Sequence, residues 1–171
     1  MLTAERVIAL LGLQPLPLEG GHFHETYRAG ELIERACLPQ RYTGARLHGS
    51  AIYYLLRDDT FSALHRLHSD EVYHFYLGQP VELLLLYLDG HGEVVVLGPD
   101  VEAGQCVQLV VPHGVWQGSR LLRSAARGHF ALLGTTMAPA YDPADFELGE
   151  RADLLARYRG HAELIRALTP Q

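Results

Sequence analysis

Apolar and polar positions change their spacing twice along the chain. The apolar residues before position 12 recur at helical intervals: Leu2, Val7, Leu10 and Leu11. Thr3 can cap such a helix and Gly12 can end it, so the pattern predicts a short N-terminal helix. The proline- and glycine-rich stretch QPLPLEGG at 14–21 cannot sit inside a regular element and reads as a connector.

From Phe23 to Met137 the pattern becomes that of strands. Short apolar or alternating runs are bounded by Gly, Pro and Asp, and they include FHETYRAG, SAIYYLLR, SALHRLH, EVYHFYLG, PVELLLLYL, EVVVLG, QCVQLVVP and HFALLGTTM. Strands that follow one another without helical patterns between them are typical of an all-β sandwich or barrel, which we place at about 22–140.

The tail returns to helical spacing. Apolar residues form a stripe that predicts C-terminal helices at about 147–168: Leu154, Leu155, Tyr158, Ala162, Ile165 and Leu168. The sequence contains no internal repeat. Its 171 residues suit one domain, which we take to span 1–171.

Composition narrows the function classes. The formal net charge of −6 argues against non-specific nucleic acid binding, which needs a basic surface. Cys37 and Cys106 are too few for a disulfide framework. The N-terminus lacks the features of a signal peptide, and no apolar run is long enough to cross a bilayer. We therefore expect a cytoplasmic protein that binds neither nucleic acid nor membrane.

The candidate chemistry lies in two segments, Phe61–Gly78 and Val111–Gly118. In the first, His65 precedes Glu71, and six residues separate Glu71 from Gly78. In the second, a Pro-His-Gly turn leads to Gln117, which we expect to face inward while Trp116 faces outward.

These spacings resemble the two motifs of the cupin superfamily. The first motif has HxH, a glutamate and a glycine, and His65, Glu71 and Gly78 match three of these positions. The second histidine position holds Leu67, with the extra histidine displaced to His68, and the histidine of the second motif is replaced by Gln117. The complete cupin motifs form a facial metal site, and the resemblance implies such a site here with two of its ligands replaced, by Leu67 and Gln117.

His65, Glu71 and Gln117 remain as the candidates for the barrel interior. We assign His65 and Glu71 as candidate catalytic residues, and all three as candidate ligands of a divalent metal that the sequence does not require. The alternative is that His65 and Glu71 only hydrogen-bond each other in a buried polar patch.

A wider set of polar and aromatic residues is expected to contact a ligand: Gln117, Tyr73, Phe75, Glu25, Tyr27 and Tyr53. By alternation Phe23, Glu25 and Tyr27 share one face, which either enters the pocket or belongs to a solvated edge strand. One of Tyr53 and Tyr54 must point inward, and Tyr53 stands in the candidate set.

Several segments together resemble the DUF985 family, the fifth cupin group: LEGGHFHETYR, SAIYYLL, SALHRLHSDEVYHFYLG, LGPDVEAGQ, VVPHGVWQG and MAPAYDPADFEL. The resemblance covers almost the whole chain and implies a double-stranded β-helix (a jelly roll), a homodimer and an internal pocket. The fold is similar to that of sugar-nucleotide epimerases that use a histidine base and a tyrosine acid without a metal. Only His65 has an evident counterpart in this chain.

We therefore expect the barrel pocket to bind a small molecule, such as a sugar or a nucleotide-like compound. A metal-independent epimerase or isomerase activity is the enzymatic version of this hypothesis. The alternatives are a non-catalytic dimeric scaffold and a metal-dependent cupin enzyme.

Overall fold

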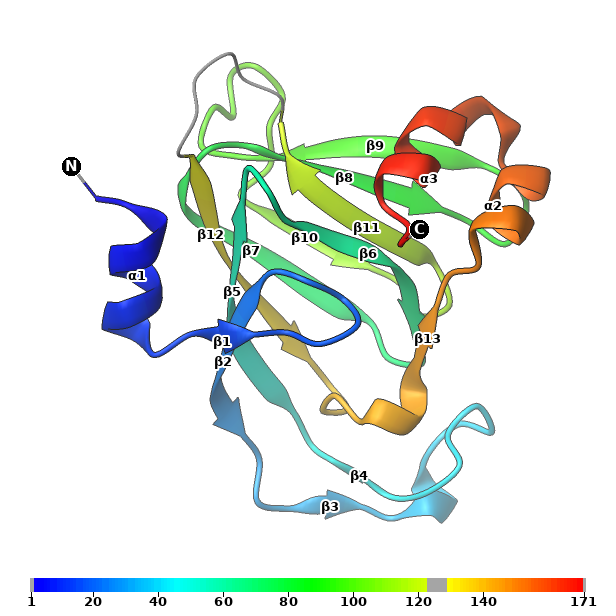
Figure 1. Ribbon diagram of the computed structural model, residues 1–171. Helices are drawn as coiled ribbons and strands as arrows, with labels where there is room; N and C mark the ends of the chain where they lie inside the picture. Colours follow the sequence, from blue (N-terminus) through cyan, green and yellow to red (C-terminus); the bar gives the residue numbers. More distant parts are fainter. Residues whose placement is uncertain (1, 123–128, 171) are drawn as a thin grey trace.

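Two antiparallel sheets form the body of the protein. The computed structural model describes residues 2–122 and 129–170, so residues 123–128 of the predicted barrel lie outside the described residues. Figure 1 shows the two sheets packed face to face, with helices at the two ends of the chain. The predicted all-β jelly roll with a short N-terminal helix and C-terminal helices is confirmed.

The larger sheet has six strands, in the order β1 (Gln14–Pro15), β2 (His22–Arg28), β5 (Ser50–Arg57), β12 (Phe130–Met137), β7 (Glu71–Gly78) and β10 (Gln108–Val111). The smaller sheet has five strands, in the order β13 (Phe146–Leu148), β6 (Phe61–Leu67), β11 (Trp116–Leu121), β8 (Val81–Leu86) and β9 (Gly92–Leu97). A separate pair, β3 (Leu32–Ile33) and β4 (Arg46–Leu47), flanks the short helix η1 (Arg35–Cys37).

Strand alternation divides the residues of the smaller sheet between two apolar layers. On β8, Leu83 and Leu85 join the core between the sheets, whereas Leu84 and Leu86 pack on the opposite side. The same rule turns Trp116 outward, as expected, onto the apolar cluster beneath the C-terminal helices. Both faces of this sheet are therefore covered, which explains why β8 is a nearly continuous apolar run.

The N-terminal helix α1 (Ala4–Leu11) forms where the pattern predicted it. Thr3 Oγ1 accepts a hydrogen bond from the Arg6 N–H at 3.3 Å, and Gly12 ends the helix with a left-handed φ of 62°. Val7 packs with Leu55 and Phe130, so the helix covers part of the outer face of the larger sheet.

The C-terminal helices are α2 (Arg151–Arg157), η3 (Arg159–His161) and α3 (Ala162–Ala167). They cover the outer face of the smaller sheet through Leu154, Tyr158 and Ile165. The helical region begins at Arg151 and not at about 147, because Phe146–Leu148 pairs with β6 as an additional strand. Among the helices in residues 2–122 and 129–170, none is long and apolar enough to cross a bilayer.

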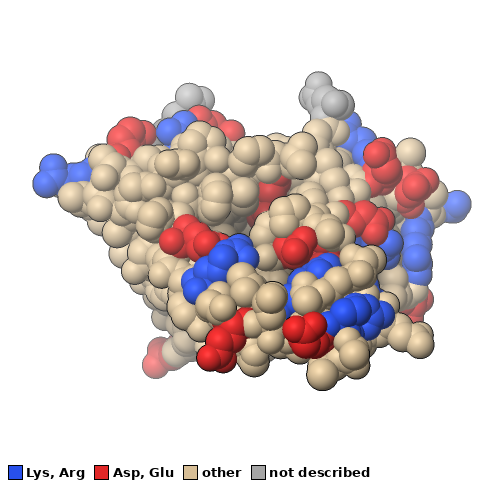
Figure 2. All heavy atoms as spheres, turned by 90° about the horizontal axis from the view of Figure 1, so that it is seen from below, with Lys and Arg blue, Asp and Glu red and all other residues tan. Residues whose placement is uncertain are grey.

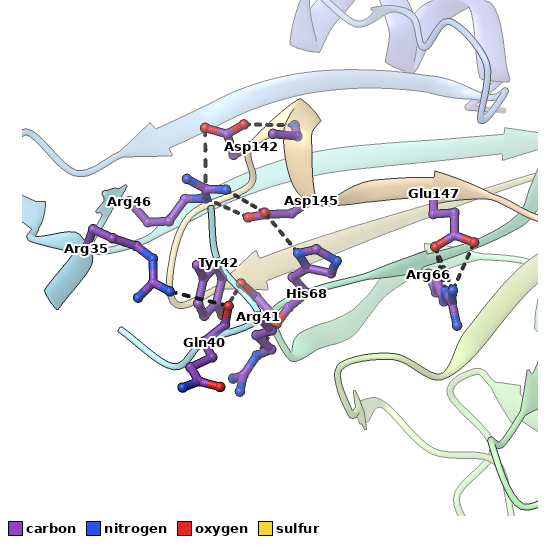
Figure 3. A network of polar contacts seen from close by, with 12 residues as sticks. Arg35, Gln40, Arg41, Tyr42, Arg46, Arg66, His68, Asp142, Asp145 and Glu147 are labelled. Atoms are coloured by element: carbon purple, nitrogen blue, oxygen red, sulfur yellow. Dashed lines mark hydrogen bonds and ion pairs between the residues drawn. The ribbon is translucent and has the colours of Figure 1, made fainter. Parts of the chain in front are cut away.

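A buried ion pair ties the β3–β4 excursion to the segment that precedes β13 (Figure 3). The Arg46 guanidinium donates to both carboxylate oxygens of Asp145, on η2 (Pro143–Asp145), at 2.7 and 2.6 Å. The side chains of Arg46 and Asp145 are only 5% and 1% exposed. His68 Nδ1 lies 3.2 Å from Asp145, so the histidine displaced from the cupin-like motif belongs to this network.

Removal of Asp145 is expected to destabilise the fold strongly. Asp145→Ala removes the bidentate partner of the buried Arg46 and leaves only Asp142, 4.0 Å away and partly exposed, so the change is expected to cost about 3–5 kcal/mol in free energy of unfolding. The control is Glu147→Ala, which breaks the exposed pair with Arg66 and should cost less than about 1 kcal/mol. Urea unfolding measures both losses, and equal losses would contradict the structural role given to Asp145.

Candidate functional site

A cavity of about 200 Å³ opens between the two sheets. Its walls come from the connector before β2, from β2, β5, β6, β7 and β12, and from residues near β13. The volume is below the range of about 300–1,000 Å³ that is typical of pockets for drug-sized ligands. The cavity therefore suits a small occupant.

His65 lies at the wall of this cavity with one ring nitrogen already committed. The residue is 1% exposed, and its Nδ1 lies 2.8 Å from the backbone oxygen of Ala63. Because a carbonyl oxygen only accepts, Nδ1 carries a proton, and Nε2 of the neutral ring is an acceptor. Phe146 stacks on the imidazole, with 5.1 Å between ring centroids, and fixes its plane.

Glu71 and Gln117 meet across the space between the sheets. Gln117 Nε2 donates to Glu71 Oε2 at 2.7 Å, and both side chains are buried. Gln117 is also the cross-strand neighbour of His65. Burial raises the pKa of the Glu71 carboxyl above its ordinary value of 4.5, and nearby Glu19 adds to this effect, whereas His65 and the hydrogen bonds oppose it.

Two buried tyrosines surround the carboxyl. Burial raises the pKa of Tyr54 and of Tyr73 well above 10.0, so both phenols keep their protons near neutral pH. The Tyr54 hydroxyl lies at the cavity and donates to the Gly20 carbonyl at 3.0 Å. Tyr73 lies in the core between the sheets, does not line the cavity, and forms a hydrogen bond with Glu71.

A β-bulge decides which residues of β2 reach the cavity. Glu25 pairs with Ile52 and Tyr27 with the next residue of β5, so Thr26 is an extra residue and the alternation shifts. Glu25 lines the cavity, but Tyr27 points away from it and is 56% exposed. Arg28 takes the inward position instead. The expectation that Glu25 and Tyr27 share an inward face is corrected by this bulge.

Two further predicted residues lie away from the cavity. Tyr53 faces the N-terminal helix and contacts Tyr76 with 6.0 Å between ring centroids, while its neighbour Tyr54 takes the inward position. Phe75 packs against the core between the sheets and does not line the cavity. The cavity thus brings together His65, Glu71 and Glu25, with Gln117 and Tyr73 supporting Glu71.

The structure adds residues that were not in the candidate set. Glu19 lines the cavity from the proline-rich connector and accepts a hydrogen bond from Ser62 at 2.8 Å. Its position in a dense polar stretch with Glu25 and Arg28 was a usable signal. Tyr141 and Phe146 come from the segment after β12, where no local pattern indicates a return to the cavity.

The donor set does not fit a tightly bound transition metal. Leu67 places hydrocarbon in the cavity where the cupin-like pattern would have a second imidazole. Gln117 directs its N–H group, not its oxygen, at Glu71. Within the described ranges, no three His, Cys, Asp or Glu side chains are grouped so that they could hold an ion. The assignment of His65, Glu71 and Gln117 as metal ligands therefore gains no support from the geometry.

Comparison with known proteins places the chain among cupins. A solved structure of protein SO0799 from Shewanella oneidensis is 30% identical, covers 99% of both chains and has a TM-score of 0.86. A hypothetical protein from Leishmania major is 28% identical, with a TM-score of 0.88 over 99% of this chain and 100% of that one. The uncharacterized yeast protein YML079W, from Saccharomyces cerevisiae, is 28% identical over 132 residues, which are 74% of this chain and 66% of that protein.

More distant structures share the fold alone. One is a dTDP sugar isomerase from Desulfovibrio desulfuricans, 17% identical over 81% of this chain and 80% of that chain, with a TM-score of 0.51. The sequence profile of the family described as Cupin superfamily (DUF985) matches residues 5–149. With that match and the barrel cavity, the chain belongs to the DUF985 family of the cupin superfamily.

Proposed function

We propose that the cavity binds a small polar molecule and that His65 and Glu71 move protons on it without a metal. One observation carries this proposal: an imidazole and a carboxyl group, both almost completely buried, line the same cavity. Two ionisable groups in such a place are costly for folding, which is why they mark functional sites.

The two groups have complementary roles in a reversible proton transfer. His65 Nε2 is the acceptor and takes a proton from a carbon next to a carbonyl group of the ligand. The electron pair of that C–H bond forms a carbon–carbon double bond, and the π pair of the carbonyl group moves to its oxygen, which receives a proton from the neutral carboxyl of Glu71. Return of a proton to carbon and of the other to Glu71 completes an epimerisation or isomerisation, with all protons balanced.

Keto sugars are the substrate class that we test first. The dTDP sugar isomerase from Desulfovibrio desulfuricans shares the fold, and its name motivates this choice. The cytoplasmic location and the homodimer expected from the sequence stay predictions, and light scattering tests the latter.

His65→Gln is expected to remove proton transfer. The protein is incubated in D₂O with free and nucleotide-linked keto sugars, and NMR measures deuterium entering at carbon. Loss of a positioned base lowers the exchange rate by about 10²–10⁴-fold. The matched control is His74→Gln, because His74 lies on the outer surface with both ring nitrogens bonded, to Thr136 and Gln108. Exchange that is absent with every sugar, or equal in both variants, would refute the proposal.

The raised pKa of Glu71 also has a consequence for stability. Above pH 4.5 the unfolded chain releases this proton, whereas the folded protein retains it until the raised pKa is passed. The folded state then binds more protons than the unfolded state, so this group makes stability fall as pH rises through that window. A neutral side chain at the same position lacks the effect.

Glu71→Gln should therefore gain stability relative to the wild type as pH increases. The lost or altered hydrogen bond with Gln117 adds a constant that does not depend on pH. Urea unfolding of both proteins from pH 4.5 upward measures the difference in free energy of unfolding. The free energy of unfolding of the variant minus that of the wild type should increase with pH and become constant above the raised pKa. A difference that does not change with pH, or that decreases, would contradict a buried Glu71 carboxyl with a raised pKa.

A further inference from the structure

The charges that line the cavity are mostly negative. Glu19, Glu25 and Glu71 each contribute a carboxyl group to its wall, and Arg28 contributes the single guanidinium among the described lining residues. Figure 2 shows that acidic and basic side chains lie side by side on the face seen from below, as expected of local ion pairs. Inside the cavity, the carboxyl groups outnumber the guanidinium groups by three to one among the described lining residues.

Arg28 is already neutralised by one of these carboxylates. Its Nε lies 2.9 Å from both oxygens of Glu25, and its Nη2 lies 2.6 Å from Oε2. Nη1 donates to the backbone oxygen of Tyr141 at 3.3 Å. An anionic ligand would have to displace Glu25 from this bidentate pair and would then face the other carboxylates.

Glu19 and Glu71 are held by neutral donors. Ser62 donates to Glu19 at 2.8 Å, and Gln117 donates to Glu71 at 2.7 Å. In the part of the chain that the structure describes, no arginine forms an ion pair with either residue. Burial is the largest cause of the raised pKa of Glu71, and His65 opposes this rise only in part.

The other polar groups that line the cavity are His65 and several hydroxyl groups, among them those of Ser50, Thr135 and Tyr141, and each of these can accept a hydrogen bond. With the Nδ1 proton of His65 directed at the Ala63 carbonyl, Nε2 is the acceptor of the neutral ring. The Tyr54 hydroxyl is committed to the Gly20 carbonyl. Aromatic rings of Phe23, Tyr141 and Phe146 complete the wall, and their faces attract cations. The site therefore complements a ligand that brings both positive charge and hydrogen-bond donors.

We propose that the ligand of this cavity is a small polar amine, bound in its protonated form, such as an amino sugar or an amino alcohol. Its ammonium group forms an ion pair with Glu19 and donates a hydrogen bond to an oxygen of Glu71, whose carboxyl keeps its proton, and its hydroxyl groups donate to the remaining acceptors. This inference rests on the proposed small-molecule site and selects the ligand class. Among the keto sugars tested for proton transfer, it favours free and amino-substituted compounds over phosphorylated and nucleotide-linked ones, because the cavity is small and offers a phosphate no uncommitted cation.

Calorimetry with matched probes tests the charge preference. One set is glucosamine, glucose and glucose 6-phosphate, and the other is ethanolamine, ethylene glycol and glycolate. In at least one set the amine should bind about tenfold or more tightly than the neutral compound, which corresponds to about 1.4 kcal/mol, and the anion should bind most weakly, because only the amine forms an ion pair with a carboxylate of the cavity. No amine binding at millimolar concentration, or neutral or anionic probes that bind as tightly, would overturn the inference.

Variants that change the charge of single residues test whether the amine binds in this cavity. Glu19→Gln should weaken amine binding about tenfold, whereas Arg28→Gln should strengthen it by freeing Glu25. Glu147→Gln is the control, since this exposed carboxylate pairs with Arg66 and does not line the cavity. Equal effects of Glu19→Gln and the control would place the amine elsewhere and refute the inference.

The two proposals fail in different ways. Amine binding that persists in His65→Gln, without deuterium exchange in the wild type, would remove the proton-transfer function and keep the ligand class. Deuterium exchange on a keto sugar, without preferential binding of amines, would support the proton-transfer function and refute the ligand class.

Discussion

The hydrogen bond from Gln117 to Glu71 joins the two sheets at the centre of the barrel. Glu71 begins β7 in the larger sheet, and Gln117 lies on β11 in the smaller one. A carboxyl group taken out of water needs compensation, and here an amide, a hydroxyl from Thr135 and a phenol from Tyr73 provide it. The distance between the sheets at this point is thus set by a polar contact, and the cavity forms beside it.

The chemistry of the cavity depends on how its imidazole is held. Ala63 fixes the proton on Nδ1 of His65, and Phe146 fixes the ring plane. Phe146 follows Asp145 directly in the chain, and the buried pair of Asp145 with Arg46 anchors that segment. A structural ion pair distant in sequence from His65 therefore stabilises the position of the candidate base.

The two replacements in the cupin-like motifs make the site unsuited to a tightly bound metal. Leu67 and Gln117 stand in place of two imidazoles, and the cavity instead contains carboxyl groups, the two phenols of Tyr54 and Tyr141, and one neutralised arginine. Such a set lacks the ligands for tight metal binding but suits proton transfer and the recognition of a positively charged group. The proposed function and the proposed class of bound molecule both follow from a cavity that has carboxyl groups and lacks two of the metal-binding imidazoles.

Reading the chain alone was enough to predict the strand-rich body, the helices at the two ends and the inward direction of His65, Leu67 and Gln117. These features depend on local periodicity, which regular strands and helices preserve. Tertiary structure decided the rest. The bulge at Thr26 exchanged Tyr27 for Arg28, because one extra residue reverses alternation. Tyr54 and not Tyr53 faces inward, and Phe146 reaches His65 only through strand pairing that no local pattern specifies.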